Sequence, residues 1–407
     1  MSKHVQDFDP LTPETFDSPH EEYARLRSQC PVARSEQWNG FWALTRYDDV
    51  VSVLSDPATY ITSVQNVVPR VAFTGRRPPL HLDPPAHTPY RRALNPLFTE
   101  ARMKALEPAI REYTRATLGR LVARGECDIV EDFSMHMPVY AFTRFLNITD
   151  DVSRELEAVA KIYNRAVQSA DDENVKATSL ALYDIARALI LKRKEEPLDP
   201  AIDPTTALLQ ARDQEGNALP DDMILGTIRQ VLVVGIIAPS VTIGSFVVHL
   251  CRDQELQQRL RAEPELVPAA IEELLRLYTP YRGFARTANK DVEINGTAIA
   301  AGEPIALLYA SANRDEDVFE NASTFDLDRV RKDHLAFGRG PHQCVGAPMA
   351  RLELRVAIEE LLAITSSFEL AGEIRPTRWP EYGALSVPVR LGAVLPDEPT
   401  ARGVITP

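Results

Sequence analysis

The chain has 407 residues, of which 44% are hydrophobic and 25% charged, a composition typical of a folded globular protein. Its 45 lysines and arginines stand against 58 acidic residues, and the resulting net charge of -13 argues against a nucleic-acid partner, because phosphate binding needs a basic face. The four cysteines (Cys30, Cys127, Cys251 and Cys344) are widely spaced, and residues 1–13 contain no apolar signal segment. These features argue against a disulfide-rich secreted protein and predict a cytoplasmic one.

In chain order, residues 41–45 are predicted as a strand and residues 47–49 as a turn. Apolar residues recur at helical spacing in six segments: 101–123, 152–170, 175–192, 224–250, 264–278 and 347–367. Segments 292–299 and 304–309 are predicted as two strands joined in a hairpin at Ala301-Gly302. We find no internal repeat, and we predict one mainly α-helical domain over residues 1–407 with a small β region.

Residues 231–248 form an apolar segment that carries no charge and is long enough to span a membrane. Gly235, Pro239 and Gly244 interrupt this run, and its flanking basic residues do not gather on one side. We therefore favour a buried core helix over a membrane span, and we expect no membrane partner.

The segment 337–346 combines closely spaced glycines with a cysteine just ahead of a predicted helix. Gly338, Gly340 and Gly346 permit a tight loop whose backbone N–H groups point at the sulfur of Cys344, and they let a flat cofactor approach. The start of the next helix would stabilise a thiolate, and Phe337 would pack against the cofactor ring. The alternative is a buried structural cysteine in a glycine turn.

The complete pattern F-G-x-G-x-H-x-C-x-G in this loop resembles that of the cytochromes P450. The resemblance implies the cytochrome P450 fold, a single triangular haem domain, with haem b as cofactor and Cys344 as the iron ligand. Glu273 and Arg276 match the family's E-x-x-R helix, and Arg329 matches the arginine of its F-D-x-x-R segment, which joins that pair. The resemblance gives these three residues a structural role.

The resemblance also implies which residues hold the two haem propionates, which need cationic or hydrogen-bonding partners when they are buried. His87 and Arg91 lie in a segment like the family's D-P-P-x-H-x-x-x-R, Arg286 lies in a matching strand, and His342 belongs to the cysteine loop. For each arginine, the alternative is an ordinary surface charge.

The long helix over the haem departs from the family, in which an acid followed by an alcohol relays protons to dioxygen. Ile237 takes the place of the acid and Ala238 that of the alcohol, and neither side chain can move a proton. Pro239 follows them and predicts a local kink.

Three explanations remain open for this altered helix. Ser240 or a water chain replaces the alcohol, protons arrive through ordered water alone, or the enzyme uses hydrogen peroxide as the peroxygenase branch does. That branch places an arginine near this point, and residues 231–248 contain none. We therefore favour an enzyme that uses O2 and supplied electrons rather than peroxide. We expect Ser240 to assist proton delivery.

Apolar residues in the family's substrate-contacting segments predict a pocket for a small hydrophobic or aromatic substrate, although each could instead pack the core. These residues are Val71, Phe73, Val234, Gly235, Ala238, Phe284 and Leu385. Relatives that the chain resembles oxidise small aromatic compounds, and O-demethylation of an aryl methyl ether is the leading expectation.

Residues 234–240 and 277–287 resemble the haem domains of self-sufficient bacterial enzymes, which carry a fused reductase with flavin and an iron–sulfur centre. The chain has no C-x4-C-x2-C set for such a cluster and no reductase or ferredoxin domain. We expect either a separate flavin/iron–sulfur reductase or a haem domain excised from a fusion.

A non-catalytic haem sensor is the competing class, since it would keep the cysteine loop and lose the distal relay. The pocket-forming segments are present and no signalling domain is attached, so we expect a monooxygenase.

Overall fold

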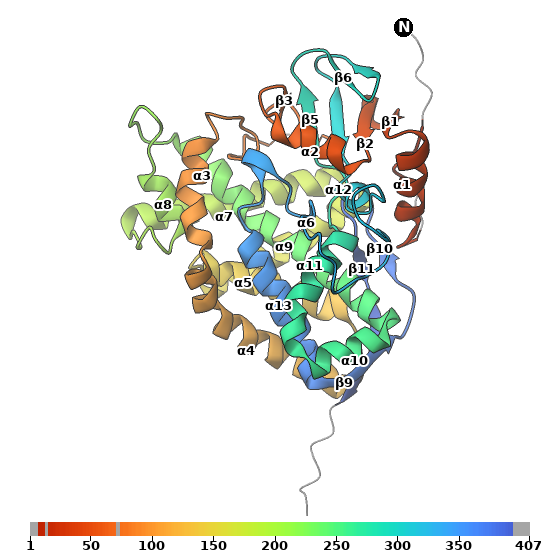
Figure 1. Cartoon of the computed structure of the whole chain (residues 1–407). Coiled ribbons are helices and arrows are strands. Elements are labelled where there is room, and N and C mark those ends of the chain that lie inside the picture. Colours follow the sequence, from red (N-terminus) through yellow and green to blue (C-terminus); the bar gives the residue numbers. More distant parts are fainter. Residues whose placement is uncertain (1–6, 13–14, 71–73, 394–407) are drawn as a thin grey trace, which may run out of the picture.

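The computed structural model describes residues 7–12, 15–70 and 74–393. Its outline is broad at the end that carries the largest sheet and narrows toward α10 and β9 (Figure 1). The α-helices of the described part are α1 (Ser18–Gln29), α2 (Tyr47–Ser55), α3 (Thr88–Leu94), α4 (Glu100–Arg124), α5 (Met137–Phe145), α6 (Asp150–Ser169), α7 (Asp172–Glu195), α8 (Pro204–Gln210), α9 (Asp221–Arg252), α10 (Gln254–Ala262), α11 (Val267–Leu277), α12 (Tyr309–Ala312) and α13 (Ala347–Ile364).

The largest sheet has the strand order β1-β2-β8-β5-β3, in which β2 and β8 run parallel and the other neighbours antiparallel. The order in a second sheet is β4-β12-β9, and the pairs β10-β11 and β6-β7 form two small ones. The strands are β1 (Val32–Ser35), β2 (Phe41–Leu44), β3 (Tyr60–Ile61), β4 (Glu126–Asp128), β5 (Ala285–Ala288), β6 (Val292–Ile294), β7 (Thr297–Ile299), β8 (Pro304–Leu307), β9 (Thr365–Leu370), β10 (Arg375–Pro376), β11 (Ala384–Ser386) and β12 (Pro388–Ala393).

The six predicted helices are confirmed as α4, α6, α7, α9, α11 and α13. One end is wrong: α13 stops at Ile364 rather than at residue 367. The next residues form β9, whose Phe368 pairs with Leu391 of β12 and is buried. Pairing with a strand that lies later in the chain therefore overrides the helical periodicity at this end.

The expected turn at residues 47–49 is wrong, because these residues begin α2. Asp315 accepts a hydrogen bond from the backbone N–H of Tyr47 at 2.8 Å and so caps the helix from a distant part of the chain. Asp48 and Asp49 lie in the first turn, where negative charge is favourable.

The expected hairpin at Ala301-Gly302 is also wrong. β6 and β7 form a hairpin by themselves, and its two turn residues, Asn295 and Gly296, have φ values of 48° and 75°. Asn-Gly is the preferred pair for such a turn because both positions need positive φ. β8 instead pairs with β2 and β5.

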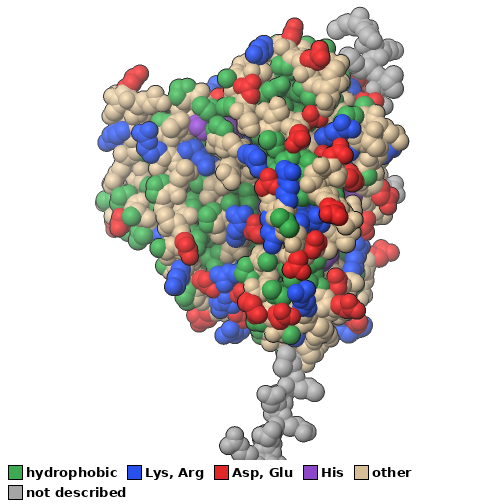
Figure 2. Space-filling model, viewed as in Figure 1, with side chains coloured by type: hydrophobic (Ala, Val, Ile, Leu, Met, Phe, Trp, Pro, Cys, Tyr) green, Lys and Arg blue, Asp and Glu red, His purple; other side chains and the backbone are tan. Residues whose placement is uncertain are grey.

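α9 crosses the centre of the molecule, where it packs against α5, α7 and α13 (Figure 1). It is the one helix of the described residues apolar and long enough to cross a membrane, and 89% of its most apolar window is buried inside the fold. Charged side chains of both signs are interspersed over the face of the molecule shown in Figure 2. The apolar character of α9 is therefore that of a core helix, and the helix continues through Pro239 without a break.

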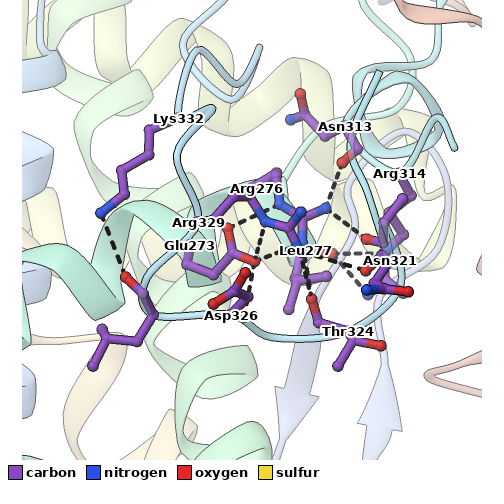
Figure 3. A network of polar contacts seen from close by, with 12 residues as sticks. Glu273, Arg276, Leu277, Asn313, Arg314, Asn321, Thr324, Asp326, Arg329 and Lys332 are labelled. Atoms are coloured by element: carbon purple, nitrogen blue, oxygen red, sulfur yellow. Dashed lines mark hydrogen bonds and ion pairs between the residues drawn. The ribbon is translucent and has the colours of Figure 1, made fainter. Parts of the chain in front are cut away.

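The three residues expected to be structural meet in a buried network (Figure 3). The Glu273 carboxylate accepts hydrogen bonds from Arg276 at 2.9 and 2.7 Å and from Arg329 at 2.8 Å. Arg276 also donates to the backbone carbonyls of Asn313 and Ala322, at 2.8 and 2.6 Å. The network ties α11 to the long loop that leads to the cysteine loop.

Candidate active site

The cysteine loop is held by its own backbone. The N–H of Cys344 donates to the carbonyl of Phe337 at 2.8 Å, and the N–H of Gln343 donates to that of Gly340 at 3.0 Å. Gly338 and Gly340 have φ values of 64° and 74°, a region that favours glycine. A Cβ on Gly340 would also lie 2.5 Å from a backbone oxygen of α2. Both the backbone conformation and the lack of space therefore require glycine at this position.

Cys344 lies three residues before the start of α13 at Ala347, and the residue is exposed. Burial raises the pKa of this thiol, whereas the backbone N–H groups of Gly346 and Ala347 and the charges of Arg91 and Arg351 act to lower it. A metal ion removes the proton of a thiol outright, and the same N–H groups and charges then stabilise the thiolate.

The Phe337 side chain is held by contacts that involve two helices. The Arg351 guanidinium lies 4.6 Å from the ring centroid of Phe337. Arg351 is held in turn by Glu272, at 2.7 Å. α11 and α13 therefore both position this aromatic side chain.

The two histidines and two arginines assigned to the propionates surround the same loop. The rings of His87 and His342 have centroids 5.0 Å apart. Burial, together with the charges of Arg286 and His87, lowers the pKa of His342 to about 3. Arg91 donates to the carbonyl of Gln343 at 2.7 Å.

Positive charge in this cluster has few acidic partners. Arg286 is buried, donates to the carbonyl of Ala285 at 2.8 Å, and forms no ion pair among the described residues. Burial lowers its pKa, and Tyr309 and Asp83 act against this effect. A basic cluster without ion pairs, beside the exposed Cys344, fits a cofactor with two carboxylates, as haem b has.

On α9, the exposed residues follow helical spacing. Val234 is 45% exposed, and Gln230 and Ala238, one turn on either side, are half-buried. This open stripe of α9 (Gln230, Val234 and Ala238) faces a space that water can enter. Ile237 lies off the stripe and is buried.

Gly235 does not line the pocket as expected. It is buried, and a Cβ added to it would overlap the ring of Phe142 on α5. This glycine allows α9 to pack closely on α5.

Ser240 is not on the open stripe either. Its hydroxyl is fully buried and donates to the carbonyl of Ile236 at 2.6 Å, one turn back along α9. Two residues correspond to about 200° of rotation in a helix, so Ser240 lies on the side opposite Ala238. Thr242 lies one turn beyond Ala238 and donates to its carbonyl at 2.6 Å. Thr242 follows Ala238 by four residues, so helical spacing alone predicts an alcohol next to Ala238. Our sequence reasoning missed it.

Of the remaining residues expected in the pocket, two are described and two are not. Phe284 is half-buried, and its ring centroid lies 4.6 Å from that of Tyr281. Leu385 is half-buried on β11, which packs against α9. Val71 and Phe73 lie outside the described residues.

Comparisons with known proteins agree with this geometry. Residues 36–371 match the family model "Cytochrome P450". The chain is 33% identical to mycinamicin IV hydroxylase/epoxidase of Micromonospora griseorubida, over 91% of this chain and 94% of that protein. It is 32% identical to linalool 8-monooxygenase of Pseudomonas putida, over 88% and 92%. The structure of cytochrome P450 CYP109Q5 from Chondromyces apiculatus is similar with a TM-score of 0.85 and 27% identity, over 95% of this chain and 98% of that one.

The fold, the cysteine loop and these relatives lead to one conclusion. Members of the matched family bind haem b through a cysteine thiolate and act as monooxygenases with O2, separate redox partners and hydrophobic substrates. The chain belongs to the cytochrome P450 family.

Proposed function

We propose that this protein is a monooxygenase that hydroxylates or O-demethylates a small aromatic compound, with an aryl methyl ether as the leading candidate. The open stripe of α9 carries this proposal, because its Val234 and Ala238 offer a small apolar surface. One relative is named for linalool and another for mycinamicin IV, so substrate size varies widely among relatives.

In this proposal Cys344 is the iron ligand, and His87, Arg91, Arg286 and His342 hold the propionates. The haem supplies the oxygen activation, for which a thiolate ligand is suited. The residues of α9 hold the substrate and control how much water reaches it.

The electrons would come from a separate flavin/iron–sulfur reductase of the type fused to the self-sufficient enzymes that the sequence resembles. A peroxide-driven reaction and a haem sensor are the alternatives. Product formation with NADH, O2 and such a reductase, but not with hydrogen peroxide alone, supports the proposal. Product with peroxide alone identifies a peroxygenase, and substrate binding without product under either condition identifies a sensor.

The substrate proposal is tested by difference absorbance of the haem-loaded protein against methoxybenzenes, linalool and a macrolide. Binding of a well-fitting substrate to the haem-loaded protein would shift its absorption. We expect the methoxybenzenes to give the largest shift, and we expect formaldehyde as a product of their turnover. A shift with the macrolide or linalool alone, and no formaldehyde from any aryl methyl ether, would disprove the aromatic assignment.

A further inference from the structure

Two buried arginines near Gln230 of the open stripe carry charge that no acid among the described residues neutralises. Arg229 on α9 is 0% exposed and Arg77, in the loop before α3, is 7% exposed. Among the described residues neither forms an ion pair, whereas the similarly buried Arg193 and Arg276 pair with Asp203 and Glu273. Burial of an unpaired cation is unfavourable, so a ligand of opposite charge would stabilise this arrangement.

Hydroxyl groups join the two arginines. Arg77 donates to Thr74 at 2.9 Å, Arg229 donates to Ser179 at 2.8 Å, and the two hydroxyls lie 2.9 Å apart. The Nε atoms of both arginines and the hydroxyl of Tyr183 are buried and have no hydrogen-bond partner. Several hydrogen-bond donors in this cluster therefore remain available to an acceptor.

Charge around this cluster is positive. Burial lowers the pKa of Arg229, and the charge of Arg77 lowers it further. His81 has a pKa lowered to about 4 by burial and then by Arg77 and Arg229. The rings of Tyr163 and Tyr183 lie over the Arg229 guanidinium at 5.5 and 5.9 Å and fix its position.

A side-chain contact connects the cluster to the Gln230 end of the open stripe. Arg229 Nη1 lies 3.5 Å from the side-chain oxygen of Gln230, the first residue of that stripe. Gln230 and Ala238 are two helical turns apart, about 12 Å along the axis. A Cβ on Gly226 would overlap the carbonyl of Arg76, so the loop that carries Arg77 lies directly on α9.

We propose that Arg77 and Arg229 bind a carboxylate of the substrate, so that the aromatic compound oxidised by this protein is an aromatic acid. This inference rests on the monooxygenase function proposed above and narrows its substrate class. The acid group would lie against the arginines, and the ring would extend along Val234 toward Ala238.

The test uses the haem-loaded full chain and two matched probes, 4-methoxybenzoate and its methyl ester. Absorbance titration gives the affinity of each for the wild type, Arg229→Met, Arg77→Met and the control Arg76→Met. Arg76 is exposed on the same loop, so its substitution changes the net charge equally. We expect the acid to bind the wild type and Arg76→Met on the order of 10 to 100 times more tightly than it binds Arg229→Met or Arg77→Met. The ester should bind all four proteins alike.

Thermal unfolding without ligand gives a second readout. Arg229→Met removes an unpaired buried cation, so it should unfold at the wild-type temperature or above it. If Arg229→Met does not fold, Arg77→Met carries the binding test.

The proposal would be overturned if the wild type bound the acid and the ester equally well. It would also be overturned if Arg229→Met and Arg77→Met both bound the acid as tightly as the wild type does. Stabilisation of the wild type by sulfate that 4-methoxybenzoate does not displace would show a site for inorganic anions only, and would also overturn it. Arginine-dependent binding of the acid without its oxidation would refute the monooxygenase proposal and leave the carboxylate site intact.

Discussion

Cys344 differs from the other three cysteines in what surrounds its sulfur. Backbone N–H groups and two arginines act on Cys344 against the effect of burial. For Cys30, burial raises the pKa to about 11, and for Cys127 and Cys251 to about 12. A raised pKa keeps these three thiols protonated and therefore weakly nucleophilic, whereas Cys344 is the exposed one of the four.

The first prediction concerns this ligand. Reduced wild type with carbon monoxide should show the long-wavelength absorption of thiolate-ligated haem, because a thiolate donates electron density to the iron. Cys344→His should lose this band, and Cys30→Ala, Cys127→Ala and Cys251→Ala should keep it. A globin-like band from the wild type would rule out thiolate ligation.

A second prediction at the residue scale concerns Arg286. Arg286→Leu removes a partner of a partly buried propionate, which costs on the order of 1–3 kcal/mol of haem binding. Transfer of haem to an apo-globin should therefore be faster from this variant than from the wild type. Arg92→Leu is the control, since Arg92 is exposed and its loss changes the net charge equally. Equal haem retention by Arg286→Leu and Arg92→Leu would remove Arg286 from the site.

At the scale of one element, α9 presents no free hydroxyl from Ala238, Ser240 or Thr242 on its open stripe. Ala238 on the open stripe has no hydroxyl, Ser240 faces the other side of the helix, and the hydroxyl of Thr242 bonds back to Ala238. Loss of general-acid delivery typically costs about 10²–10⁴-fold in rate, so a monooxygenase with this helix would need ordered water in its place.

The prediction for α9 follows from these positions. Ala238→Thr places a hydroxyl on the open stripe and should raise the ratio of product to hydrogen peroxide per NADH consumed. Ser240→Ala removes a hydroxyl on the opposite side and should leave that ratio unchanged. Both are measured with the same substrate and reductase. A changed ratio in Ser240→Ala would restore Ser240 as the proton donor.

The errors at this scale have physical causes. Ser240 is close to Ala238 in the sequence, but rotation about the helix axis separates the two side chains. The start of α2 depends on a cap from Asp315, which no local pattern reveals. The Asn295-Gly296 pair is itself typical of a hairpin turn, although our prediction places the turn at Ala301-Gly302.

For the whole molecule, the fold class was predictable because long periodic helices and the spaced motifs agree along the chain. Glu273, Arg276 and Arg329 meet as the resemblance implies. The cluster of Arg77 and Arg229 was not predictable, since an arginine in a sequence gives no sign of whether an acid will neutralise it after folding.

A buried acid, Glu381, connects distant parts of the chain through hydrogen bonds. Glu381 is 4% exposed, and its carboxyl accepts a hydrogen bond from Gln168 of α6 at 2.8 Å. The nearby Arg282 donates to the backbone carbonyl of Glu381, at 2.7 Å, rather than to its carboxyl. Burial therefore dominates and raises the pKa of Glu381 to about 7.

This raised pKa makes stability depend on pH. The native state holds the Glu381 proton up to about pH 7, whereas the unfolded chain releases it near pH 4.5, the ordinary value. The native state thus binds more protons between these values, so the contribution of Glu381 is fully present below pH 4.5 and is lost as the pH rises through 7. Relative to Glu381→Gln, the free energy of unfolding of the wild type should fall by at most about 3 kcal/mol over this window. Urea unfolding at pH 5 and pH 7.5 measures the difference, with Glu369→Gln as the exposed control. A difference between wild type and Glu381→Gln that stays constant with pH would show that Glu381 ionises normally in the native protein.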